Sequence, residues 1–166
     1  HLALVQALLD AGKNLGVTLA GIRALNALRI EKGYGAWGLE YSPDYTPWES
    51  SMDRLVKLDK GDFVGREAAI ASKSGPKRYA LRYFRIDADD ADPWGGEPIE
   101  QNGKVVGYIS SPAYGHRVGA SVAIGYLLAP HTDAQSDLTI EILGTPRAVK
   151  VLAAAPYDPD AIIMRS

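Results

Sequence analysis

Arg29 is the residue of this sequence whose position and chemistry best suit a binding role. It lies within four residues of Leu25 and Lys32, on the border of an apolar helical stripe. A guanidinium at such an edge can hold a carboxylate through two parallel hydrogen bonds. The alternative is a charged face that complements the C-terminal end of a helix, and Lys32 fits that explanation well.

Residues 33–38 have the sequence GYGAWG, which satisfies the G-x-G-x-x-G pattern of dinucleotide-binding loops. That function requires a strand before the loop and a helix N-terminus after it, so that the helix end can hold a pyrophosphate. Here an amphipathic segment precedes the glycines and a proline-containing segment follows them. Because the order is reversed, we predict a helix end and a close chain turn, and no nucleotide site.

The other residues with catalytic or metal-binding chemistry are scattered. His1, His116 and His131 show no i, i+4 pairing, so a metal site is not expected. The aspartates at positions 87, 89, 90 and 92 lack the glycine and glutamate of a calcium loop, which favours a solvated acidic loop. No serine stands in a nucleophile elbow, and the chain has no cysteine. The sequence therefore predicts no catalytic residue and no metal ligand.

Composition places the chain among ordinary globular proteins. Its 166 residues are 46% hydrophobic, its formal net charge is −2 and its pI is about 5.9. This charge balance argues against nucleic acid as a partner. No apolar run reaches the ~18 residues needed to span a bilayer, and no signal peptide is visible. We therefore expect no membrane partner and, with no cysteine present, a cytoplasmic location.

The first 75 residues predict helices and an ordered loop. Apolar residues at helical spacing predict helices over 2–11 and 19–32, and the glycines at 12 and 33 end them. Residues 34–50 contain two prolines and several aromatic side chains, which favours a loop. A strand over 52–58 and a short helix over 65–72 complete this part.

The pattern changes after the Ser-Gly-Pro sequence at residues 74–76. Strands are predicted over 78–86, 105–111, 120–128, 138–143 and 148–155. Asn102 and Gly103 form a strong hairpin signal, because both tolerate the positive φ of a type I′ turn. We therefore predict an α+β fold, with N-terminal helices and a loop in residues 1–75 and a small antiparallel β-barrel in residues 76–166.

Seven motifs follow one another in an order that composition alone does not produce. They are residues 28–33 (LRIEKG), 37–40 (WGLE), 46–49 (TPWE), 60–67 (KGDFVGRE), 77–81 (KRYAL), 107–111 (GYISS) and 123–126 (AIGY). Taken jointly, they make the chain similar to the second half of the folate-binding aminomethyltransferases, the glycine-cleavage T-protein family. The resemblance covers almost the whole chain.

Departures from the family pattern indicate a branch. Glycine-cleavage T-proteins carry a substrate-binding arginine four residues before Arg29, where this chain has Leu25. Residues 24–29 (ALNALR) and 156–159 (PYDP) resemble the dimethylglycine and sarcosine dehydrogenases. Relatives that assist iron–sulfur assembly have a cysteine where Asp62 stands.

The resemblance implies a truncated folate-binding domain with the barrel docked against it, and tetrahydrofolate as the cofactor. The family's catalytic aspartate and its pterin-binding glutamate would precede His1, so the chain alone is expected to be inactive. The resemblance places five residues at the mouth of the folate channel, where aromatic rings stack and arginines meet the glutamate tail: Arg29, Tyr34, Trp37, Glu49 and Arg78. A purely structural role is an equal alternative for each.

The resemblance also implies a parent protein and its partners. FAD would belong to a separate upstream domain, and folate would capture the one-carbon unit released from a small N-methylated amine donor. The missing N-terminal half of the folate-binding domain would be a further partner. One alternative is a non-catalytic interaction module with an exposed apolar face on its two leading helices. Another is a folate-dependent O- or S-demethylase relative with the same cradle.

Overall fold

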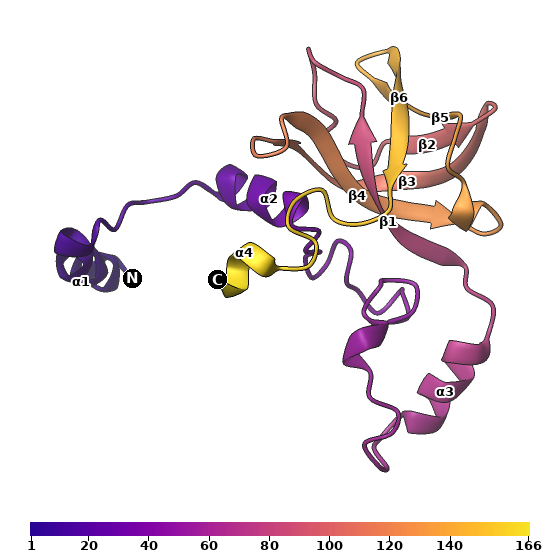
Figure 1. The fold of residues 1–166 in the computed structure, drawn as a ribbon, viewed down its shortest axis with the longest axis horizontal. Coiled ribbons are helices and arrows are strands. Elements are labelled where there is room, and N and C mark those ends of the chain that lie inside the picture. The colour runs from indigo at the N-terminus through magenta and orange to yellow at the C-terminus, as the bar shows by residue number, and fades with distance from the viewer.

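The chain forms a six-stranded barrel with a helical arm before it and a short tail after it (Figure 1). The computed structural model describes residues 1–166. The helices are α1 (Leu2–Gly12), α2 (Ile22–Glu31), α3 (Arg66–Ser74) and α4 (Ile162–Arg165), with 3₁₀ turns at Lys13–Leu15, Asp53–Leu55 and His131–Asp133. The strands are β1 (Tyr79–Ile86), β2 (Pro98–Gln101), β3 (Lys104–Gly115), β4 (Ala120–Leu128), β5 (Leu138–Ile142) and β6 (Thr145–Leu152).

The barrel is antiparallel throughout and closed, in the strand order β1-β4-β3-β2-β5-β6. Closure leaves no strand edge free to pair with another chain. Asn102 and Gly103 join β2 to β3 with φ values of 52° and 72°, which confirms the predicted hairpin. At Gly125 an added Cβ would lie 2.3 Å from the Tyr108 carbonyl oxygen, so the close approach of β3 and β4 requires glycine there.

Alternate strand residues fill the barrel. Twelve buried apolar residues form this inner core, among them Phe84, Ile109 and Leu127, which are fully buried. Side chains of successive strand residues point to opposite faces, so the remaining residues of each strand point outward. The barrel interior is therefore a packed core along most of its length.

A second apolar cluster lies outside the barrel, where α2 packs against β3 and β4. Ile30 of α2 meets Val122 and Ile124 there. The ring of Tyr45, from the loop after α2, stacks on Tyr126 with centroids 4.2 Å apart. These contacts fix the C-terminal end of α2 and the following loop to the barrel wall.

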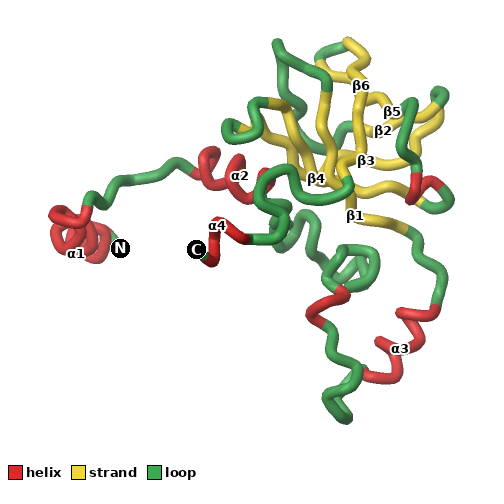
Figure 2. The backbone as a smooth tube through the Cα atoms, in the orientation of Figure 1, coloured by secondary structure: helices red, strands yellow, loops and turns green.

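The helices α1 and α3 lie away from the barrel, as the tube in Figure 2 makes plain. Only Gly12 is buried within α1, and the side chains of Leu4 and Leu8 are 62% and 61% exposed. Leu25, on α2, is 57% exposed. None of the helices combines the length and the apolar character that crossing a bilayer requires.

The predicted α+β architecture, helices followed by a small antiparallel barrel, is confirmed. The helix end and chain turn at residues 33–38 are confirmed as well, since α2 ends at Glu31 and Gly33 has a φ of 70°. The division into residues 1–75 and 76–166 stays a prediction, although α3 ends at Ser74 and β1 begins at Tyr79.

Some predictions of local structure are wrong. Residues 52–58 contain a 3₁₀ turn instead of a strand, because no strand lies beside them to pair with. No strand is predicted over β2, whose four residues begin with Pro98 and give little signal. The boundaries of α2 and β6 shift by about three residues, and β3 continues to Gly115 because it pairs with the whole of β4.

Candidate functional site

Arg29 lies in the last turn of α2, at the junction of helix, loop and barrel. Its Nη2 donates to Ser111 Oγ on β3 at 2.9 Å, and its Nη1 lies 3.4 Å from a carboxylate oxygen of Glu40. Nε donates to Asn26 Oδ1 at 3.0 Å, and Nη1 also donates to the Tyr34 carbonyl oxygen at 3.1 Å. All three guanidinium nitrogens are engaged within the protein, so the carboxylate that Arg29 holds is an internal one.

Glu40 is fully buried beneath this guanidinium. Its carboxylate accepts hydrogen bonds from the Ala36 N–H, at 2.8 Å, and from the Ser110 hydroxyl. Its carbonyl oxygen accepts the Tyr126 hydroxyl at 2.6 Å. A buried carboxylate must be paired and hydrogen-bonded to be tolerated, so Glu40 ties the loop after α2 to β3 and β4.

Glu49 and Arg78 form a second ion pair. Glu49 and Thr46 make reciprocal hydrogen bonds between side chain and backbone, the arrangement of a capping box. The Glu49 carboxylate also accepts from the Arg78 backbone N–H at 2.8 Å and from its guanidinium at 3.3 Å. Arg78 Nη2 reaches the Asp44 carbonyl oxygen at 2.6 Å. The pair thus joins the loop after α2 to the start of β1.

These contacts determine the ionisation of Glu49, which is only 2% exposed. Burial alone raises the pKa of this carboxyl, but hydrogen bonds from Thr46 and Arg78 outweigh burial and hold the pKa at about 2. The Arg78 guanidinium has its pKa raised in turn, first by its hydrogen bond to Glu49. Glu49 is therefore an anion that the protein itself satisfies.

A cavity of about 650 Å³, which we name the Tyr34 cavity, opens between the end of α2, the following loop and the tail. Tyr34 is 44% exposed and lines it, together with Tyr41 and Tyr83. Burial raises the pKa of Tyr83, so its hydroxyl stays neutral. The lining also contains three cations and one anion, Asp160; of the cations, Lys32 is paired with Asp158, which leaves Arg54 and Arg165 outside any ion pair. Rings that can stack and cations that can meet carboxylates suit a flat anionic ligand.

Trp37 lies in a different hollow. Its side chain is 78% exposed and lines a cavity of about 200 Å³ with Tyr45 and Met52, among others. Tyr41 lines both this hollow and the Tyr34 cavity. Neither of these cavities is lined by Arg29, Glu49 or Arg78. The structure brings Tyr34 and Trp37 to neighbouring hollows and places Arg29, Glu49 and Arg78 in ion pairs. The role of all five residues in folate binding stays a prediction.

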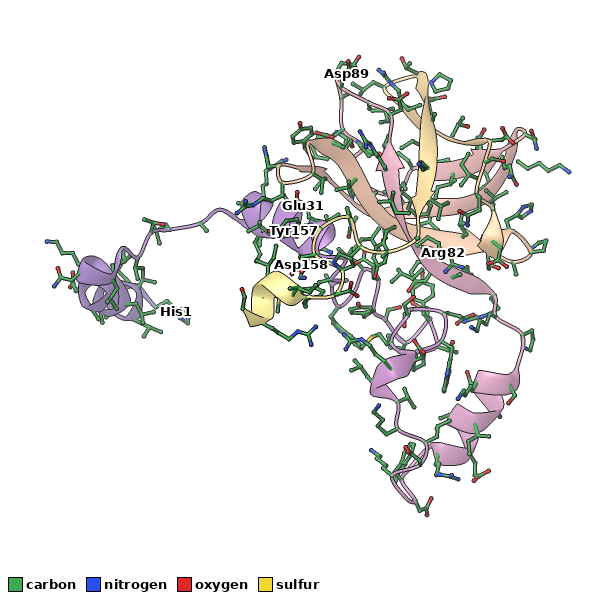
Figure 3. All side chains as sticks on the ribbon, viewed as in Figure 1. His1, Glu31, Arg82, Asp89, Tyr157 and Asp158 are labelled. Atoms are coloured by element: carbon green, nitrogen blue, oxygen red, sulfur yellow. The ribbon has the colours of Figure 1, made fainter.

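Several polar residues of this junction escape sequence reasoning. The C-terminal tail is fastened to α2 by Lys32, whose Nζ lies 2.7 Å from the Asp158 carboxylate. Glu31 accepts the N–H groups of Arg117 and Val118 at 2.7 and 3.1 Å, and its carbonyl oxygen accepts the Tyr157 N–H at 2.9 Å. Figure 3 shows Glu31, Tyr157 and Asp158 gathered beside α2.

Among the polar contacts of Glu31, Lys32, Glu40 and Glu49, the sequence carried a usable signal only for the contact between Thr46 and Glu49. The T-x-x-E spacing of residues 46–49 is that of a capping box, which assigns Glu49 a structural role. Glu40 and its partner Ser110 are 70 residues apart along the chain, and Asp158 and its partner Lys32 are 126 apart, so no local pattern predicts these contacts.

The fold and the junction define a class, a small antiparallel barrel with an upstream helix and loop on its outer wall. An apolar cluster and ion pairs of two buried carboxylates hold the helix and loop there. Residues 80–158 match the family described as the glycine cleavage T-protein C-terminal barrel domain. Residues 1–60 match the GCVT N-terminal domain. The chain belongs to the glycine cleavage T-protein family, as its motifs predict.

Individual relatives support the same assignment. The chain is 37% identical to mitochondrial dimethylglycine dehydrogenase of Homo sapiens, over 86% of this chain and 16% of the relative. It is 33% identical to the aminomethyltransferase of Saccharopolyspora erythraea, over 96% of this chain and 44% of the relative. The chain therefore spans less than half the length of these relatives.

A solved structure shares the fold. The glycine cleavage system aminomethyltransferase T from Bartonella henselae superposes with a TM-score of 0.80 and 22% identity, over 95% of this chain and 44% of that chain. The superposition covers nearly the whole chain, so the arm and the barrel both belong to the shared fold.

Proposed function

We propose that this chain is the C-terminal portion of a tetrahydrofolate-dependent one-carbon transferase. The observation that carries the proposal is the match of its two parts to the two domains of the T-protein family, in the family's order. Bound tetrahydrofolate would supply a nitrogen nucleophile that accepts the one-carbon unit. The chain's own residues would bind and orient part of the cofactor, and the catalytic groups would come from the rest of the protein.

The Tyr34 cavity is the part of the chain that fits this cofactor. Tyr34 presents an exposed ring for stacking, and Arg54 and Arg165 supply cations for the carboxylates of a glutamate tail. Arg29 and Glu49 would act by positioning the loop that carries Tyr34 and Trp37, since their own polar atoms are engaged within the protein. Arg78, 61% exposed in its side chain, would present its outer edge to ligand.

The donor we propose is a small N-methylated amine. Support comes from relatives named dimethylglycine dehydrogenase, sarcosine dehydrogenase and 4-methylaminobutanoate oxidase. In such a parent protein, FAD would occupy a separate upstream domain and oxidise the amine. An O- or S-demethylase using the same cradle is the alternative, because no residue of this chain is assigned to the donor.

Calorimetric titration of 5-formyltetrahydrofolate into the purified chain tests folate binding. We expect micromolar affinity, and a loss of about tenfold in Tyr34→Ala through the missing stacking contact. Trp94→Ala is the matched control, since Trp94 is 82% exposed and lies outside the Tyr34 cavity. Absence of binding to the unchanged chain would contradict the proposal that this portion contributes to the folate site.

A second function is favoured by the exposed apolar face of α1 and α2, which includes Leu4, Leu8 and Leu25. This face would dock the remaining part of the T-protein fold, because the solved relative is more than twice as long and the arm belongs to the shared fold. Sedimentation of the chain with a separately produced upstream segment should show a stable complex. Leu4→Glu should abolish it, and Val64→Glu, at an exposed apolar residue outside this face, should not.

A further inference from the structure

One end of the barrel holds two buried polar atoms without partners. They are Ser121 Oγ and Arg147 Nε, and every other buried side-chain nitrogen or oxygen of the chain has a hydrogen-bond partner. Ser121 is fully buried. Leaving such groups unpaired costs free energy, so each requires an explanation.

The strand register places both side chains inside the same mouth. Ile86 of β1 pairs with Ser121 on one side and with Val149 on the other. Ser121 precedes the core residue Ala123 by two positions, and Arg147 precedes the core residue Val149 by two. Residues two apart on a strand share a face, so Ser121 and Arg147 both point toward the barrel interior at its end.

Ser121 and Arg147 are both among the residues that line one cavity of about 420 Å³, which we name the mouth cavity. Tyr114, whose Cα pairs with that of Ser121, lines it as well. The loop after β1 borders it with Asp87 and Asp89, and Asp89 stands at the end of the barrel far from α3 in Figure 3. The mouth cavity shares no lining residue with the Tyr34 cavity. Mouths of β-barrels are recurrent ligand sites, and this volume suits a small molecule.

The charges of the lining select the kind of ligand. Arg85 and Arg147 are cationic, whereas Asp87 and Asp89 are anionic. Asp90 already holds Arg147 Nη2 at 2.7 and 2.9 Å, whereas the buried Nε–H has no acceptor. Counting Asp90, the mouth has one more negative than positive charge. A free anion would therefore be repelled, while a ligand with both signs of charge would find partners for each.

We propose that the mouth cavity binds a small zwitterion of the amino-acid class. Its carboxylate accepts hydrogen bonds from Ser121 Oγ and Arg147 Nε, and its ammonium group faces Asp87 and Asp89. The site is independent of folate binding, because it lies on the barrel alone and uses none of the residues assigned to the cofactor.

The Arg147 Nε–H resonance in a ¹⁵N-labelled chain reports directly on this site, with Arg147→Lys used to assign it. Glycine at millimolar concentration should shift the resonance saturably. Acetate and methylammonium, each with one of the two charges, should bind at least about tenfold more weakly. An equal response to acetate would overturn the zwitterion assignment, and no response to glycine would mean that the two polar atoms are met by ordered water only.

Ser121→Ala supplies a second, independent readout. The change removes a hydroxyl that has no protein partner, so the thermal midpoint should not fall, while glycine binding should weaken about tenfold. Ser136→Ala, at an exposed serine outside the mouth cavity, should leave binding unchanged. Unaltered glycine binding in Ser121→Ala would contradict the proposed contact.

Discussion

Glu40 and Glu49 are buried carboxylates that join segments far apart along the chain. Glu40 connects the loop after α2 to β3, and Glu49 connects the same loop to the start of β1. Each is accompanied by an arginine, Arg29 in the first case and Arg78 in the second. An unpaired buried charge is strongly destabilising. Removal of the arginine alone is therefore expected to lower the free energy of unfolding by more than the net attraction within the pair.

Glu49→Gln is expected to lower the free energy of unfolding by about 2 kcal/mol, through lost charge-assisted hydrogen bonds. The folded pKa of about 2 lies below the ordinary 4.5, so the stabilisation is fully present above pH 4.5 and fades as the pH falls toward 2. Urea unfolding of both proteins as a function of pH measures this difference. Glu141→Gln, at an exposed position, is the control, and a constant difference down to pH 2 would refute the assignment.

The helix α2 connects three parts of the molecule. Its Ile30 packs on the barrel wall, its Glu31 holds the turn between β3 and β4, and its Lys32 holds the tail. The Asp158 carboxylate that meets Lys32 also accepts the N–H groups of Ile162 and Ile163, at 2.7 and 3.2 Å. One carboxylate thus both anchors the tail and begins α4.

Lys32→Met should release the tail while the barrel remains folded. The side-chain hydrogen bond from Lys32 holds the pKa of Asp158 below its usual range. Without Lys32 the tail loses this contact, and on acidification the Asp158 carboxylate becomes protonated at a higher pH than in the unchanged chain. Amide hydrogen exchange at Ile162 and Ile163 should accelerate about tenfold, with barrel amides unchanged. Lys73→Met, on exposed α3, should leave every rate unchanged, and equal protection in both variants would disprove the anchor.

At the scale of the whole molecule, stability is concentrated in the barrel and its outer wall. Both apolar clusters lie there, whereas α1 contributes no buried side chain. The arm projects from the body through an extended linker (Figure 1). Its exposed apolar residues therefore add nothing to the core of this chain, in keeping with the docking role proposed above.

Deletion of residues 1–19 is expected to change the free energy of unfolding by less than about 0.5 kcal/mol, because the removed side chains are almost entirely exposed. Calorimetric unfolding of the full and shortened chains measures the difference. A large loss of stability in the shortened chain would show that the arm packs on the barrel.

The sequence by itself determined the class of fold, the family and most strand positions. Local signals were sufficient for these, since strand alternation, the Asn102–Gly103 turn and ordered motifs depend on neighbours in the chain. It did not predict β2, whose four residues give too little signal, and it predicted a strand over residues 52–58, where no partner strand is present and a 3₁₀ turn forms instead.

Only the tertiary structure decided which side chains meet. Arg29 meets Glu40 and Ser111, and Ser121 and Arg147 face one mouth from strands that are not neighbours in the barrel. The physical reason is that charge pairing and burial act through space, across separations of up to 126 residues, while the local pattern records only periodicity. The two buried polar atoms without partners, Ser121 Oγ and Arg147 Nε, likewise lie in β4 and β6, strands that meet at one mouth only in the closed barrel.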